Sequence, residues 1–146
     1  IKKQKKIFDL NKQIKFISKL EFDLTNDQKK TLDEINQDLK SNQKMFRLLQ
    51  GDVGSGKTIV ALIASANVIS SGFQVCLMAP TEILAKQHYT LTKKLFDDHI
   101  NIRLLTSKTE RNERNNILDN LTFNSLKDLS NKSIEVLKKH MSEYIL

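Results

Sequence analysis

The sequence is poor in residues that cross-link a chain and in long apolar runs. Its one cysteine, Cys76, sits in an apolar run, where we expect a small buried hydrophobe, and a single cysteine excludes a disulfide framework, which favours a reducing cytoplasm. No apolar run approaches the about 18 residues of a membrane helix, and the basic N-terminus is not followed by a signal-peptide core. We therefore expect a cytoplasmic protein without a membrane partner. We also expect a monomer.

Acidic residues are scarce at the start of the chain. Residues 1–20 hold seven lysines against one acid, Asp9, so this segment carries +6 of the net charge of +7. Such an arm suits the phosphates of a nucleic acid. It equally suits the solvated face of a linker helix, because apolar residues recur there close to helical spacing. We predict a basic helical linker over residues 1–21.

Glycine is also rare, and three of the four glycines fall within one octet. That octet matches the phosphate-binding loop G-x-x-x-x-G-K-[ST] and reads Gly51-Asp52-Val53-Gly54-Ser55-Gly56-Lys57-Thr58. In such a loop, backbone N–H groups cradle phosphates, Lys57 reaches the β- and γ-phosphates, and the Thr58 hydroxyl binds Mg²⁺. The alternative is a glycine-rich turn that merely precedes a helix. The motif predicts a nucleoside triphosphate with magnesium, with Lys57 and Thr58 as the catalytic side chains.

The order of predicted elements indicates an α/β fold. Strand-like runs cover residues 46–50, 73–79 and 100–106, and helical patterns cover residues 25–40, 59–70, 81–98 and 110–121. This alternation predicts a parallel sheet with flanking helices and a ligand at the carboxyl ends of its strands. Residues 122–146 predict a helical tail of unknown role. A phosphate-loop hydrolase also needs a strand that ends in an acid, and no such strand follows residue 106, so we expect an incomplete sheet.

Three strings carry a resemblance to a known family. Two are residues 45–58 and residues 78–88, which read Met78-Ala79-Pro80-Thr81-Glu82-Ile83-Leu84-Ala85-Lys86-Gln87-His88, and the third reads Phe22-Asp23-Leu24-Thr25-Asn26-Asp27-Gln28. Their order and spacing resemble the motor of the RecG family of superfamily-two DNA helicases, over roughly residues 8–121. The resemblance implies part of a RecA-like P-loop NTPase lobe over residues 22–121, with ATP and Mg²⁺ as cofactors.

The resemblance also implies roles for single residues. Gln28 would recognise adenine, Phe22 would stack on the base, and Thr25 belongs to the same segment. Thr25 and Gln28 also match a capping box, which only closes a helix end, and both roles can coexist.

On the DNA side, the resemblance implies contacts at Pro80, Thr81, Glu82 and Thr106. Thr81 is alternatively an ordinary N-cap. Ser107 stands where the family usually has glycine.

We therefore expect the front part of the motor of an ATP-dependent DNA helicase or translocase, acting in branch migration, recombination and repair on branched or forked DNA. The chain is expected to be a piece of a longer protein and not a competent ATPase by itself. The alternatives are a truncated, non-catalytic module that binds nucleotide or DNA, and a superfamily-two motor of the transcription-repair coupling factor or PriA type. Residues 79–82 disfavour a small-molecule kinase.

Overall fold

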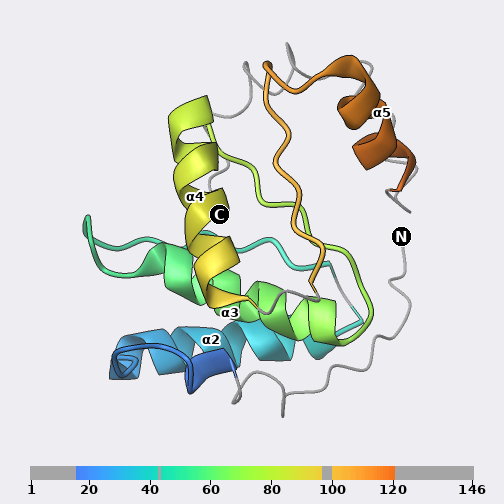
Figure 1. The fold of residues 1–146 in the computed structure, drawn as a ribbon. Helices are drawn as coiled ribbons and strands as arrows, with labels where there is room; N and C mark the ends of the chain where they lie inside the picture. Colours follow the sequence, from blue (N-terminus) through green and yellow to red (C-terminus); the bar gives the residue numbers. More distant parts are fainter. Residues whose placement is uncertain (1–15, 43, 97–99, 121–146) are drawn as a thin grey trace. The chain divides into compact units, whose positions relative to one another are not determined.

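The computed structural model describes residues 16–42, 44–96 and 100–120, and the chain divides between Val75 and Cys76 into two compact units. The first unit contains α2 (Asn26–Lys40) and α3 (Lys57–Ser70), and the second contains α4 (Glu82–Leu95) and α5 (Arg111–Asp119) (Figure 1). Most of the predicted basic linker and the predicted helical tail lie outside these residues. None of the described helices is long and apolar enough to span a bilayer.

Helix α2 begins where the sequence predicts, because its cap is chemically complete. The Thr25 hydroxyl accepts the Gln28 N–H at 3.2 Å, and the Gln28 side-chain carbonyl accepts the Thr25 N–H at 2.9 Å. This reciprocal pair satisfies two N–H groups that the helix itself leaves without partners. The capping-box prediction is confirmed.

The core of the first unit lies where α2 and α3 contact each other, side by side in Figure 1. Both helices place apolar side chains in it: Leu32 and Ile35 from α2, and Val60, Leu62, Ile63 and Ala66 from α3. Burying a large aliphatic side chain contributes about 1.5–3 kcal/mol. These side chains therefore fix α2 against the helix that starts at the end of the predicted phosphate-binding loop.

Two polar links accompany this apolar contact. Within the buried contact, the Asn67 side-chain amide donates to the Asn36 side-chain carbonyl at 2.8 Å. At its edge, the Arg47 guanidinium bridges Glu34 at 2.6 Å and Asp38 at 2.8 Å, so the segment before the loop is tied to α2. Apolar burial is not directional, whereas hydrogen bonds are. These polar links therefore define the position of α2 relative to α3 and to the segment around Arg47 more closely than apolar burial alone.

The predicted parallel sheet is not observed in the described part of the chain. Residues 44–50, 73–79 and 101–106 run as irregular segments there, without a β-ladder. A ladder requires a neighbouring strand at about 4.8 Å, and none of the three has one among these residues. Several of their apolar side chains are at the surface, with Phe46 89% and Leu48 67% exposed. Cys76, expected to be buried, is likewise exposed.

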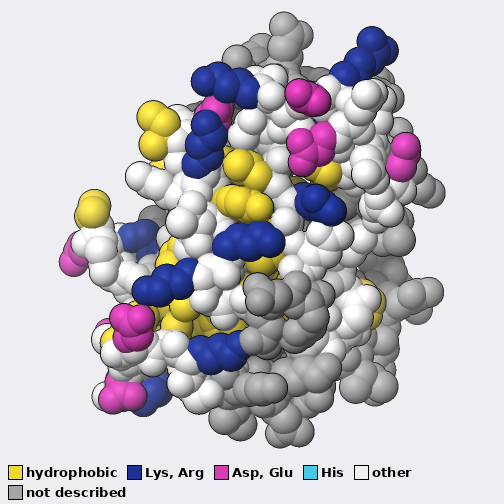
Figure 2. Space-filling view, viewed as in Figure 1, with side chains coloured by type: hydrophobic (Ala, Val, Ile, Leu, Met, Phe, Trp, Pro, Cys, Tyr) yellow, Lys and Arg dark blue, Asp and Glu magenta, His cyan; other side chains and the backbone are white. Residues whose placement is uncertain are grey.

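Helix α4 differs from α3 because none of its residues is buried. It is capped as predicted, since the Thr81 hydroxyl accepts the Leu84 N–H at 3.3 Å. It ends at Leu95, a little before the predicted end near residue 98, and residues 97–99 lie outside the description. Figure 2 shows the consequence, with apolar side chains at the surface among those of Lys and Arg.

Candidate functional site

The loop between residue 50 and α3 turns through two glycines in the left-handed conformation. Gly54 and Gly56 both adopt left-handed conformations, with φ of 83° and 81°. The Ser55 N–H donates to the Asp52 carbonyl at 3.1 Å and closes a turn between them. Residues other than glycine rarely adopt such backbone angles, so the two glycines allow the loop to curl before α3 begins.

The Lys57 ammonium folds back onto this loop. It donates to the carbonyl oxygens of Gly51 at 2.8 Å and Asp52 at 2.6 Å, and lies 3.4 Å from the Ser55 hydroxyl. An ammonium has three donors, and here they point to oxygens of the loop that would surround a phosphate. Thr58 follows in the first turn of α3, partly buried. The donors fit a triphosphate, and the hydroxyl is of the kind that binds Mg²⁺.

Gln28 lies directly on the loop, although the two are far apart in sequence. Its side-chain N–H donates to the Ser55 carbonyl at 2.9 Å, while its carbonyl closes the α2 cap. A methyl group on Gly56 would lie only 2.4 Å from that side-chain nitrogen, so the approach depends on glycine. The structure thus brings Gln28 to the loop, and Thr25 is hydrogen-bonded to Gln28 in the cap of α2. Phe22, half exposed at 50%, has surface available for stacking.

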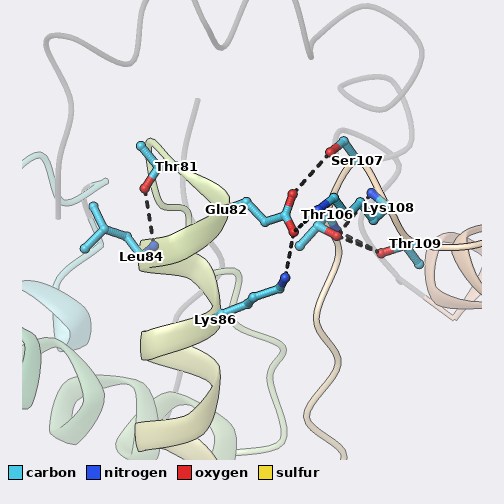
Figure 3. A network of polar contacts seen from close by, with 8 residues as sticks. All are labelled: Thr81, Glu82, Leu84, Lys86, Thr106, Ser107, Lys108 and Thr109. Carbon is cyan, nitrogen blue, oxygen red and sulfur yellow. Dashed lines mark hydrogen bonds and ion pairs between the residues drawn. The ribbon is translucent and has the colours of Figure 1, made fainter.

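In the second unit, two predicted DNA-contacting segments meet each other (Figure 3). Glu82, in the first turn of α4, pairs with Lys86 at 2.7 Å and with Lys108 at 3.9 Å, and accepts a hydrogen bond from the Ser107 hydroxyl at 3.4 Å. The turn after residue 105 is closed by the Thr106 N–H, which donates to the Thr109 hydroxyl at 2.9 Å. Glu82 and Thr106 are therefore brought together.

Charge partners lower the pKa of Glu82 below its usual range. The hydrogen bond from Lys86 is the largest cause, and Lys108 and Ser107 add to it, against a smaller opposing effect of desolvation. A hollow of about 290 Å³ opens beside this cluster and is also lined by Tyr89, Arg103 and Glu113. The other two residues predicted to contact DNA lie at the start of α4: Thr81 caps the helix, and Pro80 precedes that cap.

Sequence reasoning missed three residues with structural roles: Arg47 and Asn67 at the contact between α2 and α3, and Lys108 beside Glu82. Arg47 interrupts an apolar run. Its hydrogen bond to Asp38 is the main cause that raises the pKa of its guanidinium above the ordinary value. Asn67 stands in a mostly apolar helix and is fully buried. A polar residue within an apolar pattern is thus a usable signal, whereas nothing local marks Lys108.

Comparisons with known proteins agree with this arrangement. A family model described as DEAD/DEAH box helicase matches residues 25–143. The chain belongs to the DEAD/DEAH box helicase family. The match begins at the Thr25 cap and runs past the phosphate-binding loop, α4 and the 106–109 turn.

The relatives support the predicted resemblance to RecG. The chain is 47% identical over 114 residues to the ATP-dependent DNA helicase RecG of Staphylococcus epidermidis, covering 78% of this chain and 17% of that protein. The RecG of Borreliella burgdorferi is 47% identical over 116 residues, covering 77% and 17%. The resemblance is confirmed, and the chain spans about a sixth of the length of these relatives.

A comparison with solved structures supports the predicted fold class. The structure of RecG bound to a three-way DNA junction matches with a TM-score of 0.75 and 42% identity, covering 84% of this chain and 17% of that one. The family and this match together confirm the predicted RecA-like P-loop NTPase fold class.

Proposed function

We propose that this chain is the ATP-binding front part of the motor of a RecG-type, ATP-dependent DNA helicase that acts on branched DNA in recombination and repair. The observation that carries the proposal is the hydrogen bond from the Gln28 amide to the Ser55 carbonyl. It joins the base-reading segment to the phosphate-binding loop within one compact unit. A site for a nucleotide requires both parts at neighbouring positions.

The chemistry of Gln28 favours adenine. A glutamine amide offers one donor and one acceptor side by side, which match N6–H and N7 of adenine, whereas the same edge of guanine presents two acceptors. Each end of the Gln28 amide makes one hydrogen bond to the protein and retains capacity for another. An aromatic ring such as Phe22 adds about 1–3 kcal/mol when a base stacks on it.

The loop itself would bind the phosphates of the nucleotide. Lys57 would exchange its carbonyl partners for phosphate oxygens, and the loop N–H groups would take the remaining charge. Thr58 would bind the Mg²⁺ that arrives with the nucleotide and neutralises its phosphates. The described residues include no acid strand to orient a water, so we propose that the isolated chain binds ATP without turning it over.

The second unit would bind DNA through the sugar-phosphate backbone of the DNA. Thr81 and Thr106 supply hydroxyls, and Pro80 and Glu82 belong to the same two segments. Contacts of this kind position a motor on a duplex without reading its sequence, as branch migration requires. We further propose a monomer located in the cytoplasm.

Equilibrium binding of a fluorescent ATP analogue to the 146-residue chain with Mg²⁺ tests the nucleotide site. Lys57→Ala should weaken binding at least about tenfold, because a charge-assisted contact is lost. Gln28→Ala should lower the preference for the ATP analogue over the GTP analogue. Lys40→Ala, which removes an exposed lysine from the end of α2, is the matched control and should bind like the unmodified chain. Equal affinity for both analogues in the unmodified chain would contradict adenine reading.

A further inference from the structure

We propose that Glu82 is the built-in counter-ion of Lys86 and Lys108, and that a phosphate of bound DNA competes with its carboxylate for these two lysines. This inference rests on the proposed DNA-binding role of the second unit. It replaces the expectation that Glu82 itself contacts DNA. Lys86 and Lys108 then become the phosphate-binding cations of this surface.

The geometry places one carboxylate between two cations from separate segments (Figure 3). One oxygen of Glu82, Oε1, lies 2.7 Å from the Lys86 Nζ on α4 and 3.9 Å from the Lys108 Nζ on the turn. The lysine side chains are 55% and 78% exposed, while that of Glu82 is only 26% exposed. A ligand arriving from solvent therefore reaches the lysines more readily than the carboxylate that neutralises them.

A phosphate and a carboxylate make the same demand on this cluster. Both are anionic acceptors, and an ammonium serves either as a point charge. A carboxylate that stays beside the lysines repels an incoming phosphate and neutralises the charge that attracts it. Glu82 thus weakens DNA binding at this surface and reduces its dependence on salt.

The position of Lys108 does not depend on Glu82 alone. Its N–H donates to the Thr106 hydroxyl at 3.3 Å, and the Thr106 N–H donates to the Thr109 hydroxyl at 2.9 Å. A glutamine at position 82 still offers a carbonyl oxygen to the Ser107 hydroxyl. Glu82→Gln therefore removes the charge and leaves the turn with its own hydrogen bonds.

The test is binding of fluorescently labelled forked DNA by the 146-residue chain across a series of salt concentrations. Glu82→Gln should tighten binding about fivefold at low salt and steepen the plot of log affinity against log salt by up to about one unit, because freed lysines release counter-ions. Lys108→Gln should weaken binding and flatten the plot. Glu113→Gln is the matched control: Glu113 lines the same hollow and removing it changes the net charge equally, but it pairs with neither lysine.

The outcomes separate the inference from the proposed function. If the unmodified chain binds DNA and Glu82→Gln binds it equally or more weakly, the counter-ion role is wrong and the DNA-binding role stands. An equal gain in Glu113→Gln would also overturn the inference, because net charge alone would explain it. No binding by the unmodified chain at any salt concentration overturns both. If Glu82→Gln proves unfolded by circular dichroism, Lys108→Gln decides, and an unchanged salt plot refutes the inference.

Discussion

Replacing Gly56 with alanine tests the contact between Gln28 and the phosphate-binding loop. Two penalties are expected from the structure. Gly56 has φ of +81°, which an alanine adopts only with strain, and the new methyl carbon would lie 2.4 Å from the Gln28 side-chain nitrogen. The first penalty concerns the backbone of residue 56 alone. The second reaches across to α2, because the Gln28 amide must move.

The size of each penalty follows from what is lost. A left-handed conformation costs an alanine about 1–2 kcal/mol. Moving the Gln28 amide breaks its hydrogen bonds to the Ser55 carbonyl and the Thr25 N–H, both exposed to solvent. An intramolecular hydrogen bond contributes about 0.5–1.5 kcal/mol net, so two exposed bonds at the low end amount to about 1 kcal/mol. We expect Gly56→Ala to lower the free energy of unfolding by about 2–3 kcal/mol in total.

The chain provides a matched control for the backbone penalty. Gly72 has φ of +82°, and a methyl group there would meet no atom within 4 Å. Urea unfolding followed by circular dichroism should therefore show Gly72→Ala less destabilised than Gly56→Ala by about 1 kcal/mol. In a Gln28→Ala background this difference should disappear. Equal destabilisation of the two alanine variants, or a difference that persists without Gln28, would refute the contact.

Three further changes test other links. Asn67→Leu should cost about 1–3 kcal/mol in urea unfolding, because it removes the hydrogen bond that the buried Asn36 carbonyl accepts from Asn67, and adding Asn36→Leu should recover part of that loss. Arg47→Lys should lower the unfolding free energy by about 0.5–1 kcal/mol, because an ammonium bridges the two partly exposed carboxylates of α2 less well than a guanidinium. Glu82 has a lowered pKa, so its charge stabilises the folded state above the ordinary carboxyl pKa, and this contribution is lost as pH falls through the lowered value. Glu82→Gln should therefore lose less stability on acidification than the unmodified chain, measured by urea midpoints at neutral and acidic pH.

Helix ends could be predicted from the sequence because their chemistry is local. The capping box at Thr25 needs only a hydroxyl and an amide three residues apart, and the stop near Gly72 needs only a residue that tolerates a positive φ. The phosphate-binding loop belongs to the same class, since its glycines, Lys57 and the following helix are contiguous. The structure shows the Thr25 cap, the positive φ of Gly72, and, in the loop, two left-handed glycines followed by a helix that begins at Lys57. None of them depends on what lies elsewhere in the chain.

Pairing of strands depends on distant residues, and the predicted sheet is not confirmed in the part of the chain that the structure describes. An apolar run such as the one around Leu48 suits a strand, but it forms one only when another strand supplies hydrogen bonds along its length. Hydropathy likewise misplaces residues with long-range partners. Asn67 is fully buried, and its side-chain N–H donates to Asn36 on another helix, while Arg47 is held near an apolar contact by two carboxylates of α2.

Glu82 shows why a motif locates a segment without defining the role of each residue in it. The resemblance places Glu82 in a DNA-contacting string, and the α4 start that carries it is where the sequence predicts. Its role depends on Lys108, which lies in a different segment and turns the carboxylate from a contact into a counter-ion. That change reverses the sign of the expected mutant effect, because removing a contact weakens DNA binding and removing a competitor strengthens it. The sign, rather than the mere sensitivity of DNA binding to position 82, is therefore what distinguishes a motif residue that touches DNA from one that restrains its neighbours.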